Sequence, residues 1–379
     1  MKQTLMKKLW AEFKYWAISL FILALLFELI SSMVFYRKYA TGKLAFLHLT
    51  ENYFKNRPDQ SLYHRMHEQV RPDSIPEMTR RIADEIWDAN KYTYEPWLMF
   101  KVIDYQSKYV NINGFERRSI PAEYINPASN DTIDIYFLGG STMYGYNVSD
   151  AETIPSQFLK IYQKESSGGK SVRIRNFGIP YYYSKQELIL LSKLLFEGNR
   201  PDIVIFLDGL NDFYPSRMLY YDRPHFSYAM QQVFDGRMFQ KANRSILDSS
   251  DQFYIDPPGI DPVDYYDALF AKYVNNISHA TALCLKKGIK SYFFCQPVPF
   301  YNYPNRVNDP IAYKMNYDRF DHIYPKLEKS AATIKNFIFL GNMLKHEKGK
   351  PFVDQVHYSP AFSEQIAKEL YITVKKDLQ

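Results

Sequence analysis

Five short apolar segments alternate with longer helix-like segments between Asp131 and Gln379. The apolar segments are rich in Ile, Val and Phe, as buried strands are, and helical periodicity lies between them. Strands that alternate with helices form parallel sheets, and right-handed crossovers leave few topologies. We therefore predict an α/β fold with a doubly wound five-stranded parallel sheet. The predicted strands are Asp134–Leu138, Val172–Asn176, Ile203–Asp208, Ser291–Gln296 and Asn336–Leu340.

The first predicted strand ends within the sequence IDIYFLGGSTMYG, from Ile133 to Gly145. Ser141 follows two glycines there, so the turn brings it to the edge of the sheet where parallel α/β proteins bind ligands. A serine in that place can act as a nucleophile. The alternative is that Gly139 and Gly140 only form a turn and that Ser141 caps the next helix.

Three further blocks lie at the end of an element, as Ser141 does. Two are at the ends of predicted strands, and one precedes the last helix. Asn176-Phe177-Gly178 ends the second strand, Gly209-Leu210-Asn211-Asp212 follows the third, and Asp354-Gln355-Val356-His357 precedes the final helix. With these four blocks the chain resembles the SGNH or GDSL-like hydrolase family, which contributes a serine, a glycine, an asparagine and a DxxH pair in this order. The resemblance covers Asp131 to Leu378 and implies a flavodoxin-like SGNH fold.

The resemblance also implies roles for these residues. Ser141 is the nucleophile, His357 is the base that takes its proton, and Asp354 orients the histidine. The oxyanion formed on an ester carbonyl is bound by the backbone N–H groups of Ser141 and Gly178 and by the side-chain amide of Asn211.

One block departs from the family pattern. The chain has Gly139-Gly140-Ser141-Thr142 where the usual signature is Gly-Asp-Ser, so the aspartate before the nucleophile is missing. That aspartate is not one of the triad residues, and its absence bears on the subfamily more than on the chemistry.

The segment from Tyr15 to Tyr36 is apolar and about as long as the ~20 residues that span a bilayer. We predict one transmembrane helix over 15–36, with residues 1–14 as a cytoplasmic tail. The lysines before it slightly outnumber the basic residues after it, which favours this orientation. The catalytic domain would then be periplasmic or extracellular. Glu28 interrupts the span, either because it contacts a membrane protein partner or because it reaches water or headgroups.

Residues 37–130 are expected to form a mainly helical lead-in or stalk, and 131–379 the catalytic domain. Within the lead-in, NINGFERRSIP is expected to be a turn with extended flanks.

A long connection from Phe213 to Gly259 follows the asparagine block. Loops of this length are often functional, and aromatic residues are frequent in its first part. We expect a substrate wall here, the alternative being an ordinary surface excursion. The wall residues are Tyr214, Tyr220, Tyr221 and His225.

No metal or nucleotide motif occurs in the chain: CxxC, HExxH and the P-loop are all missing. We therefore predict no metal and no cofactor. Cys284 and Cys295 are expected to be reduced core thiols. The net charge of +6 comes from scattered Lys and Arg, so nucleic acid is not an expected partner.

The sequence thus predicts a membrane-anchored serine esterase or O-acyltransferase. The expected substrate is an ester-linked acyl group, such as acetyl, on envelope polysaccharide, and the 33 Tyr and 27 Phe suit sugar stacking as well as an ordinary core. A lipid esterase or thioesterase is the alternative among enzymes. A glycan-binding scaffold without catalysis is the alternative outside them.

Overall fold

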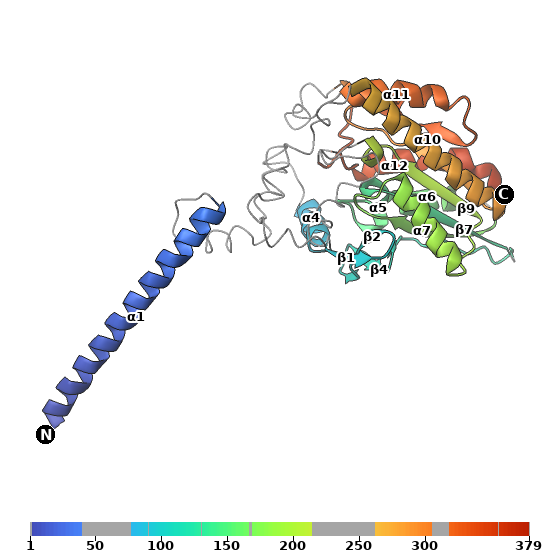
Figure 1. The fold of residues 1–379 in the computed structure, drawn as a ribbon. Coiled ribbons are helices and arrows are strands. Elements are labelled where there is room, and N and C mark those ends of the chain that lie inside the picture. Colours follow the sequence, from blue (N-terminus) through green and yellow to red (C-terminus); the bar gives the residue numbers. More distant parts are fainter. Residues whose placement is uncertain are drawn as a thin grey trace. The chain divides into compact units, whose positions relative to one another are not determined.

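A computed structural model gives the fold (Figure 1). The chain divides into two compact units, Met1–Arg65 with Gln232–Ser249, and Met66–Gln231 with Ser250–Gln379. The residues that the structure describes are 2–39, 77–89, 91–129, 131–166, 169–213, 262–304, 318–354 and 356–378.

The described part of the first unit is one long helix, α1 (Lys2–Tyr39). Its window Phe13–Ile30 has a mean hydropathy of 1.9, and none of that window is buried within the protein. The helix is therefore long and apolar enough to cross a membrane, although a signal sequence has the same properties.

Five parallel strands form the centre of the second unit: β7 (Thr132–Gly139), β8 (Ser171–Gly178), β9 (Ile203–Asp208), β10 (Lys290–Cys295) and β11 (Phe337–Phe339). Their order in the sheet is β11-β10-β9-β7-β8. Numbered along the chain this is 2-1-3-4-5, the flavodoxin-like order of doubly wound sheets. The predicted fold class is confirmed, and each predicted strand lies within about two residues of the observed one.

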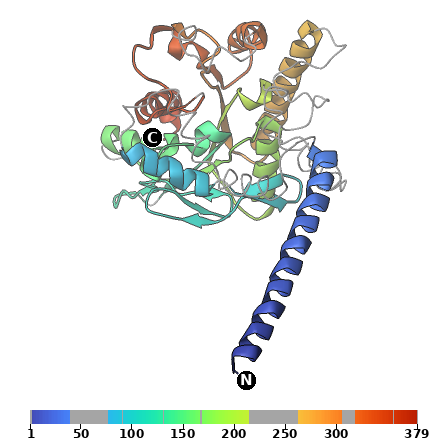
Figure 2. The ribbon, with the colours of Figure 1, turned by 90° about the vertical axis from the view of Figure 1, so that its left-hand side faces the viewer.

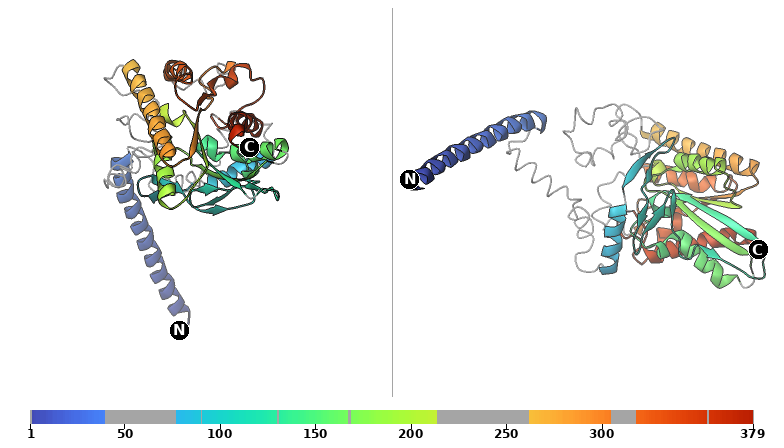
Figure 3. Two further views of the ribbon diagram at one scale, coloured as in Figure 1. Left: turned by 90° about the vertical axis from the view of Figure 1, so that its right-hand side faces the viewer. Right: turned by 90° about the horizontal axis from the view of Figure 1, so that it is seen from below.

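Helices cover both faces of this sheet (Figure 3, right). Three pack on one face: α7 (Ser184–Phe196), α10 (Pro262–Lys286) and α11 (Asp318–Ser330). On the other face α6 (Ile154–Glu165) packs beside α12 (Pro360–Val374) (Figure 2). The short helices are α5 (Ser141–Tyr144), η1 (Asp150–Glu152), η2 (Asn211–Phe213), η6 (Gly341–His346) and η7 (Lys375–Asp377).

The side chains of β7 alternate between the two hydrophobic cores, one on each face of the sheet. Ile135 and Phe137 belong to the core under α6 and α12, whereas Tyr136 and Leu138 belong to the core under α7 and α10. Successive side chains of a strand point to opposite faces, so a strand covered on both sides is apolar throughout. The two cysteines, Cys284 and Cys295, are free and buried, as predicted.

The prediction of a mainly helical lead-in is wrong for its described part. After α4 (Glu77–Ala89) come six short strands: β1 (Tyr92–Glu95), β2 (Met99–Val102), β3 (Tyr105–Gln106), β4 (Asn111–Asn113), β5 (Glu116–Arg117) and β6 (Glu123–Tyr124). β1 and β2 form a separate antiparallel hairpin, while β5 and β6 pair with β8 and extend the central sheet.

The strands form because aromatic residues are frequent in this segment and because the edge of β8 offers it hydrogen bonds. Gly114, at a φ of 64°, makes the predicted turn between β4 and β5. The segment is therefore part of the second unit rather than a stalk. Residues 40–76 of the predicted lead-in lie outside the described residues.

Candidate active site

Ser141 lies where the order of the sheet reverses. It follows β7, and the neighbouring β9 is followed by Asn211, with Gly139 of β7 paired to Leu207 of β9. Crevices at such switch points are the usual ligand sites of open α/β sheets. The fold therefore brings the serine block and the asparagine block to one place.

Two close approaches explain the pair of glycines before Ser141. A Cβ on Gly139 would lie 2.5 Å from the Cβ of Met143 and 2.9 Å from the carbonyl oxygen of Leu207. A Cβ on Gly140 would lie 2.5 Å from Nδ2 of Asn211. With glycine at this position, the asparagine amide can lie against the backbone that precedes Ser141.

A continuous hydrogen-bonded relay joins Ser141, His357 and Asp354. Nε2 of His357 lies 2.8 Å from Oγ of Ser141, and Nδ1 lies 2.6 Å from Oδ2 of Asp354. These distances are within the range expected for a nucleophile, its base and the group that orients the base. The sequence separates the serine from the histidine by 216 positions, and the fold brings them together.

Asp354 is held by further donors. Its Oδ1 accepts the backbone N–H groups of Val356 and His357, each at 2.9 Å, and its Oδ2 accepts Nδ2 of Asn147 at 2.6 Å. Burial alone would raise the pKa of this carboxyl. The charge and hydrogen bond of His357 and the two backbone donors outweigh that effect and leave the pKa below its ordinary value. The carboxylate is thus kept ionised and fixed in orientation.

The loop after α5 contributes two residues that the sequence did not single out for this site. Asn147 is 2% exposed and has a φ of 66°, and its amide donates to Asp354 as described. The ring of Tyr146 stacks on the imidazole of His357, with centroids 4.5 Å apart and an angle of 24° between the planes. Both therefore limit how the relay side chains can turn.

A buried arginine holds this loop in shape. Nη1 of Arg117 donates to the carbonyl oxygens of Tyr144 and Gly145, Nη2 donates to that of Val148, and Nε pairs with Asp150. Both charged side chains are nearly inaccessible to solvent. Because Arg117 comes from β5, the segment that precedes β7 helps to build the site.

Two of the three predicted oxyanion donors are at the site. The N–H of Ser141 opens α5, where backbone N–H groups have no intrahelical acceptor. Nδ2 of Asn211 donates one hydrogen to the carbonyl oxygen of Tyr182 at 2.6 Å, and an amide nitrogen carries a second one.

The third predicted donor, the N–H of Gly178, has a partner within the chain. Its N–H donates to Oδ1 of Asn176 at 3.0 Å, so it is already engaged. A Cβ at Gly178 would overlap the backbone of Met143 and Tyr144. The residue is therefore glycine because α5 packs closely against β8, a constraint that the sequence block alone does not reveal.

Three carboxyl groups lie behind the asparagine block. Glu187 and Asp208 are 0% and 3% exposed, and their carboxyl groups hydrogen-bond to each other and to no other partner among the described residues. Asp212 accepts the hydroxyl and the N–H of Ser184. Burial raises the pKa of all three, that of Asp208 to about 6 and that of Asp212 to about 7. These carboxyl groups thus keep their protons at pH values where exposed carboxyls have lost theirs.

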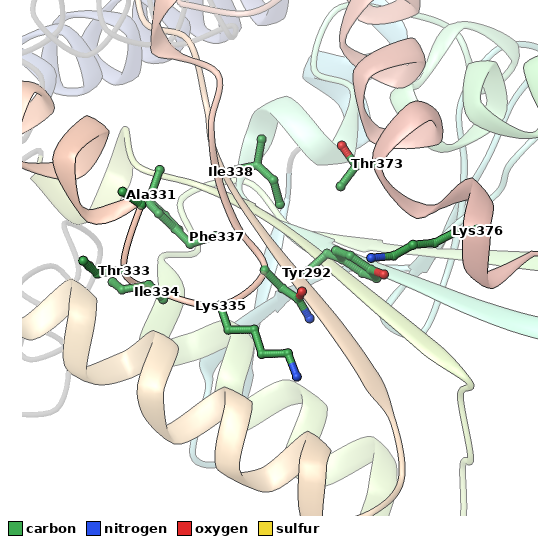
Figure 4. A pocket seen from close by; sticks show the side chains of 11 residues that line it. Tyr292, Ala331, Thr333, Ile334, Lys335, Phe337, Ile338, Thr373 and Lys376 are labelled. Atoms are coloured by element: carbon green, nitrogen blue, oxygen red, sulfur yellow. The ribbon is translucent and has the colours of Figure 1, made fainter.

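The predicted wall residues Tyr214, Tyr220, Tyr221 and His225 lie outside the described residues. Two hollows elsewhere on the second unit contain none of the relay residues. One, of about 400 Å³, is at edge strand β11 and has Lys335 and Lys376 on its rim (Figure 4). The other, of about 510 Å³, is lined by Arg173, Arg175 and their acidic partners. Among the described residues no cluster of His, Cys, Asp and Glu could hold a metal ion.

Solved structures similar to this chain include several esterases. TesA is 15% identical, with a TM-score of 0.38, over 64% of this chain and 98% of its own. The acetyl xylan esterase AlAXEase is 12% identical, with a TM-score of 0.37, over 64% and 100%. The acetylxylan esterase Axe2 from Geobacillus stearothermophilus is 14% identical, with a TM-score of 0.35, over 65% and 94%. A putative lipolytic protein of the G-D-S-L family from Desulfitobacterium hafniense is also similar.

No family model matches the chain, and no curated protein sequence matches it.

Proposed function

We propose that this protein is a serine ester hydrolase or O-acyltransferase of the SGNH type. The observation that carries this proposal is the unbroken relay from Oγ of Ser141 through both nitrogens of His357 to Oδ2 of Asp354. A binding module has no need of a serine, an imidazole and an oriented carboxylate in mutual contact, whereas a serine esterase requires all three.

The geometry supports the following sequence of steps. His357 accepts the proton of Ser141 as Oγ attacks the ester carbonyl, and Asp354 stabilises the imidazolium. The N–H of Ser141 and the second amide hydrogen of Asn211 stabilise the oxyanion. His357 then returns the proton to the departing alcohol, which leaves an acyl group on Ser141. Transfer of that group to water or to a second hydroxyl restores the enzyme.

The acceptor is decided by positioning, because the same base and oxyanion donors serve water and sugar hydroxyls alike. We propose an acetylated envelope polysaccharide as the substrate class and acyl transfer as the favoured direction. The apolar helix α1 supports membrane attachment, which would keep the enzyme close to such a polymer. In this proposal the catalytic unit faces the periplasm or the cell exterior, as the charge bias around α1 suggests.

The test is turnover of an activated acetyl ester by the full chain in detergent, with and without acetyl-accepting oligosaccharides. Ser141→Ala and His357→Ala should each lower kcat by at least about 10³-fold, because triad members act as a unit. Ser129→Ala and His279→Ala, which change the same residue types away from the site, should leave turnover intact. Full activity of Ser141→Ala would contradict the proposal.

Mass spectrometry of the products then decides the direction. Acetylated oligosaccharide formed in competition with acetate supports a transferase. Acetate alone across a broad panel of acceptors supports a hydrolase. Faster cleavage of lysolipid than of any sugar ester would support the lipid esterase alternative.

A further inference from the structure

The hairpin β1–β2 carries the most exposed tryptophan of the described part of the second unit. Trp97 lies in the turn between the strands and is 87% exposed, and its φ of 69° is in the left-handed region. A bulky residue is uncommon at such a φ, and Met99, two positions later, has a φ of 73°. Conformations of this kind persist where the surrounding structure imposes them, often at ligand sites.

The hairpin is attached to the candidate site through one residue. The carbonyl oxygen of Tyr182 accepts the amide of Asn211, and the hydroxyl of the same tyrosine donates to the carbonyl oxygen of Phe100 in β2 at 2.5 Å. The rings of Tyr182 and Phe100 also meet edge to face at 5.3 Å. Thus one buried residue, Tyr182, contacts both the amide of Asn211 and the hairpin.

Further contacts fix the hairpin along α7 (Figure 1). Nε2 of Gln186 donates to the carbonyl oxygen of Leu98 at 2.9 Å, and Glu95 pairs with Lys193 at 3.4 Å. These two anchors are seven residues apart on the helix, or about 10 Å at a rise of ~1.5 Å per residue. Trp97 lies between Glu95 and Leu98 in the chain, so its backbone is held from both sides.

Aromatic rings continue from the site to the hairpin. Tyr181, next to Tyr182, is 38% exposed and meets the ring of Tyr92 at 6.0 Å. Tyr94, 55% exposed, is two residues beyond Tyr92 on β1 and therefore on the same face of the strand. A row of partly exposed tyrosines thus leads from the neighbourhood of Asn211 toward the turn with Trp97.

We propose that this row, defined as Tyr181, Tyr94 and Trp97, is a binding platform for a carbohydrate polymer whose ester group reaches Ser141. Rings with an apolar face and a wet edge suit sugars, which present C–H faces and hydroxyl edges. Glu95, two positions before Trp97, is ion-paired with Lys193, and this pair favours a polar ligand over lipid. This inference rests on the proposed function for its link to Ser141, but polymer binding can be measured without turnover.

The experiment measures binding of the full chain in detergent micelles to partially acetylated xylan, alginate and chitosan by titration calorimetry. Trp97→Ala should raise Kd for at least one polymer about tenfold, and Tyr94→Ala with Trp97→Ala should raise it further. The same variants should raise KM for that polymer. Leu285→Ala, which removes a 78% exposed apolar side chain from α10, is the matched control and should change neither constant.

Wild-type affinity for every polymer retained in the double variant would overturn the platform, and so would no binding of any polymer by the wild type. A second measurement uses vesicles that contain brominated phosphatidylcholine. The fluorescence of Trp97 is the difference between wild type and Trp97→Phe. If brominated lipid quenches that difference, the ring lies in lipid, which also overturns the proposal. If polymer binding depends on Trp97 while the small ester is not turned over, the platform stands and the proposed esterase function fails.

Discussion

Replacing Asp208 by asparagine tests the account of the buried carboxyl groups. Asp208 ends β9 with 3% of its surface exposed, and its carboxyl group hydrogen-bonds to that of Glu187 and to no other partner among the described residues. Burial raises its pKa to about 6, against a smaller lowering contribution from Glu187. Asp208→Asn keeps the shape of the side chain and removes its titration.

The sign of the effect follows from linkage between protonation and folding. A carboxyl whose pKa is higher in the folded chain than in the unfolded chain binds a proton on folding. Its stabilising contribution is complete below the unfolded pKa of about 3.9 and is lost as the pH rises through the folded pKa. With a folded pKa of about 6, the wild type should lose on the order of 1 kcal/mol between pH 5 and pH 8 through this group.

The assay is urea unfolding of the full chain in detergent at pH 5 and pH 8, for wild type and Asp208→Asn. The stability of the variant relative to wild type should be higher at pH 8 than at pH 5, by on the order of 1 kcal/mol. Any fixed cost of burying the new amide cancels in that comparison. Asp377→Asn is the control, because hydrogen bonds from Lys290 and Tyr292 lower the pKa of Asp377 and its carboxyl stays ionised over this range.

An equal difference between variant and wild type at the two pH values would refute the reasoning. It would mean that Asp208 does not titrate between pH 5 and pH 8, and that the negative charge is distributed differently between Glu187 and Asp212.

Three further predictions concern the site and the anchor. Asn211→Ala should lower kcat about 10²- to 10³-fold with little change in KM for a small ester, because its amide acts on the oxyanion; an unchanged kcat would remove it from the oxyanion site. Asn147→Ala should lower kcat less than Asp354→Ala does, because Asn147 only orients the carboxylate. Steady-state kinetics of the two variants measure this, and the reverse order would contradict it. A cysteine placed just after Tyr39 should react with an impermeant thiol reagent in intact cells or spheroplasts, and protection until lysis would reverse the proposed orientation.

Much of the fold of the second unit was predictable because its helices and strands are indicated by residues within each element. Helix α6 begins at Ile154 and ends at Glu165, as its Thr153 cap, the following proline and its apolar spacing indicate. The strands are apolar throughout because helices cover both faces of the sheet. The relay residues could be named because each is in a short block at the end of an element.

Other parts of the site had no local signal. Arg117 is one basic residue in a polar stretch, and only the folded chain shows that it enters the loop from Tyr144 to Val148. Asn147 and Asp354 are distant in sequence, so nothing in either neighbourhood indicates their contact. The packing role of Gly178 had no signal either, because a glycine needed for helix packing and a glycine that exposes its N–H are alike in sequence.

The claim that Ser141 is an activated nucleophile is tested most directly by covalent labelling. The full chain in detergent is treated with a fluorophosphonate, digested, and the modified peptide is located by mass spectrometry. We predict one phosphonylated residue, Ser141, with labelling abolished in Ser141→Ala and strongly slowed in His357→Ala. Undiminished labelling of Ser141→Ala, or no labelling of the wild type under conditions that label a known serine esterase, would contradict the account.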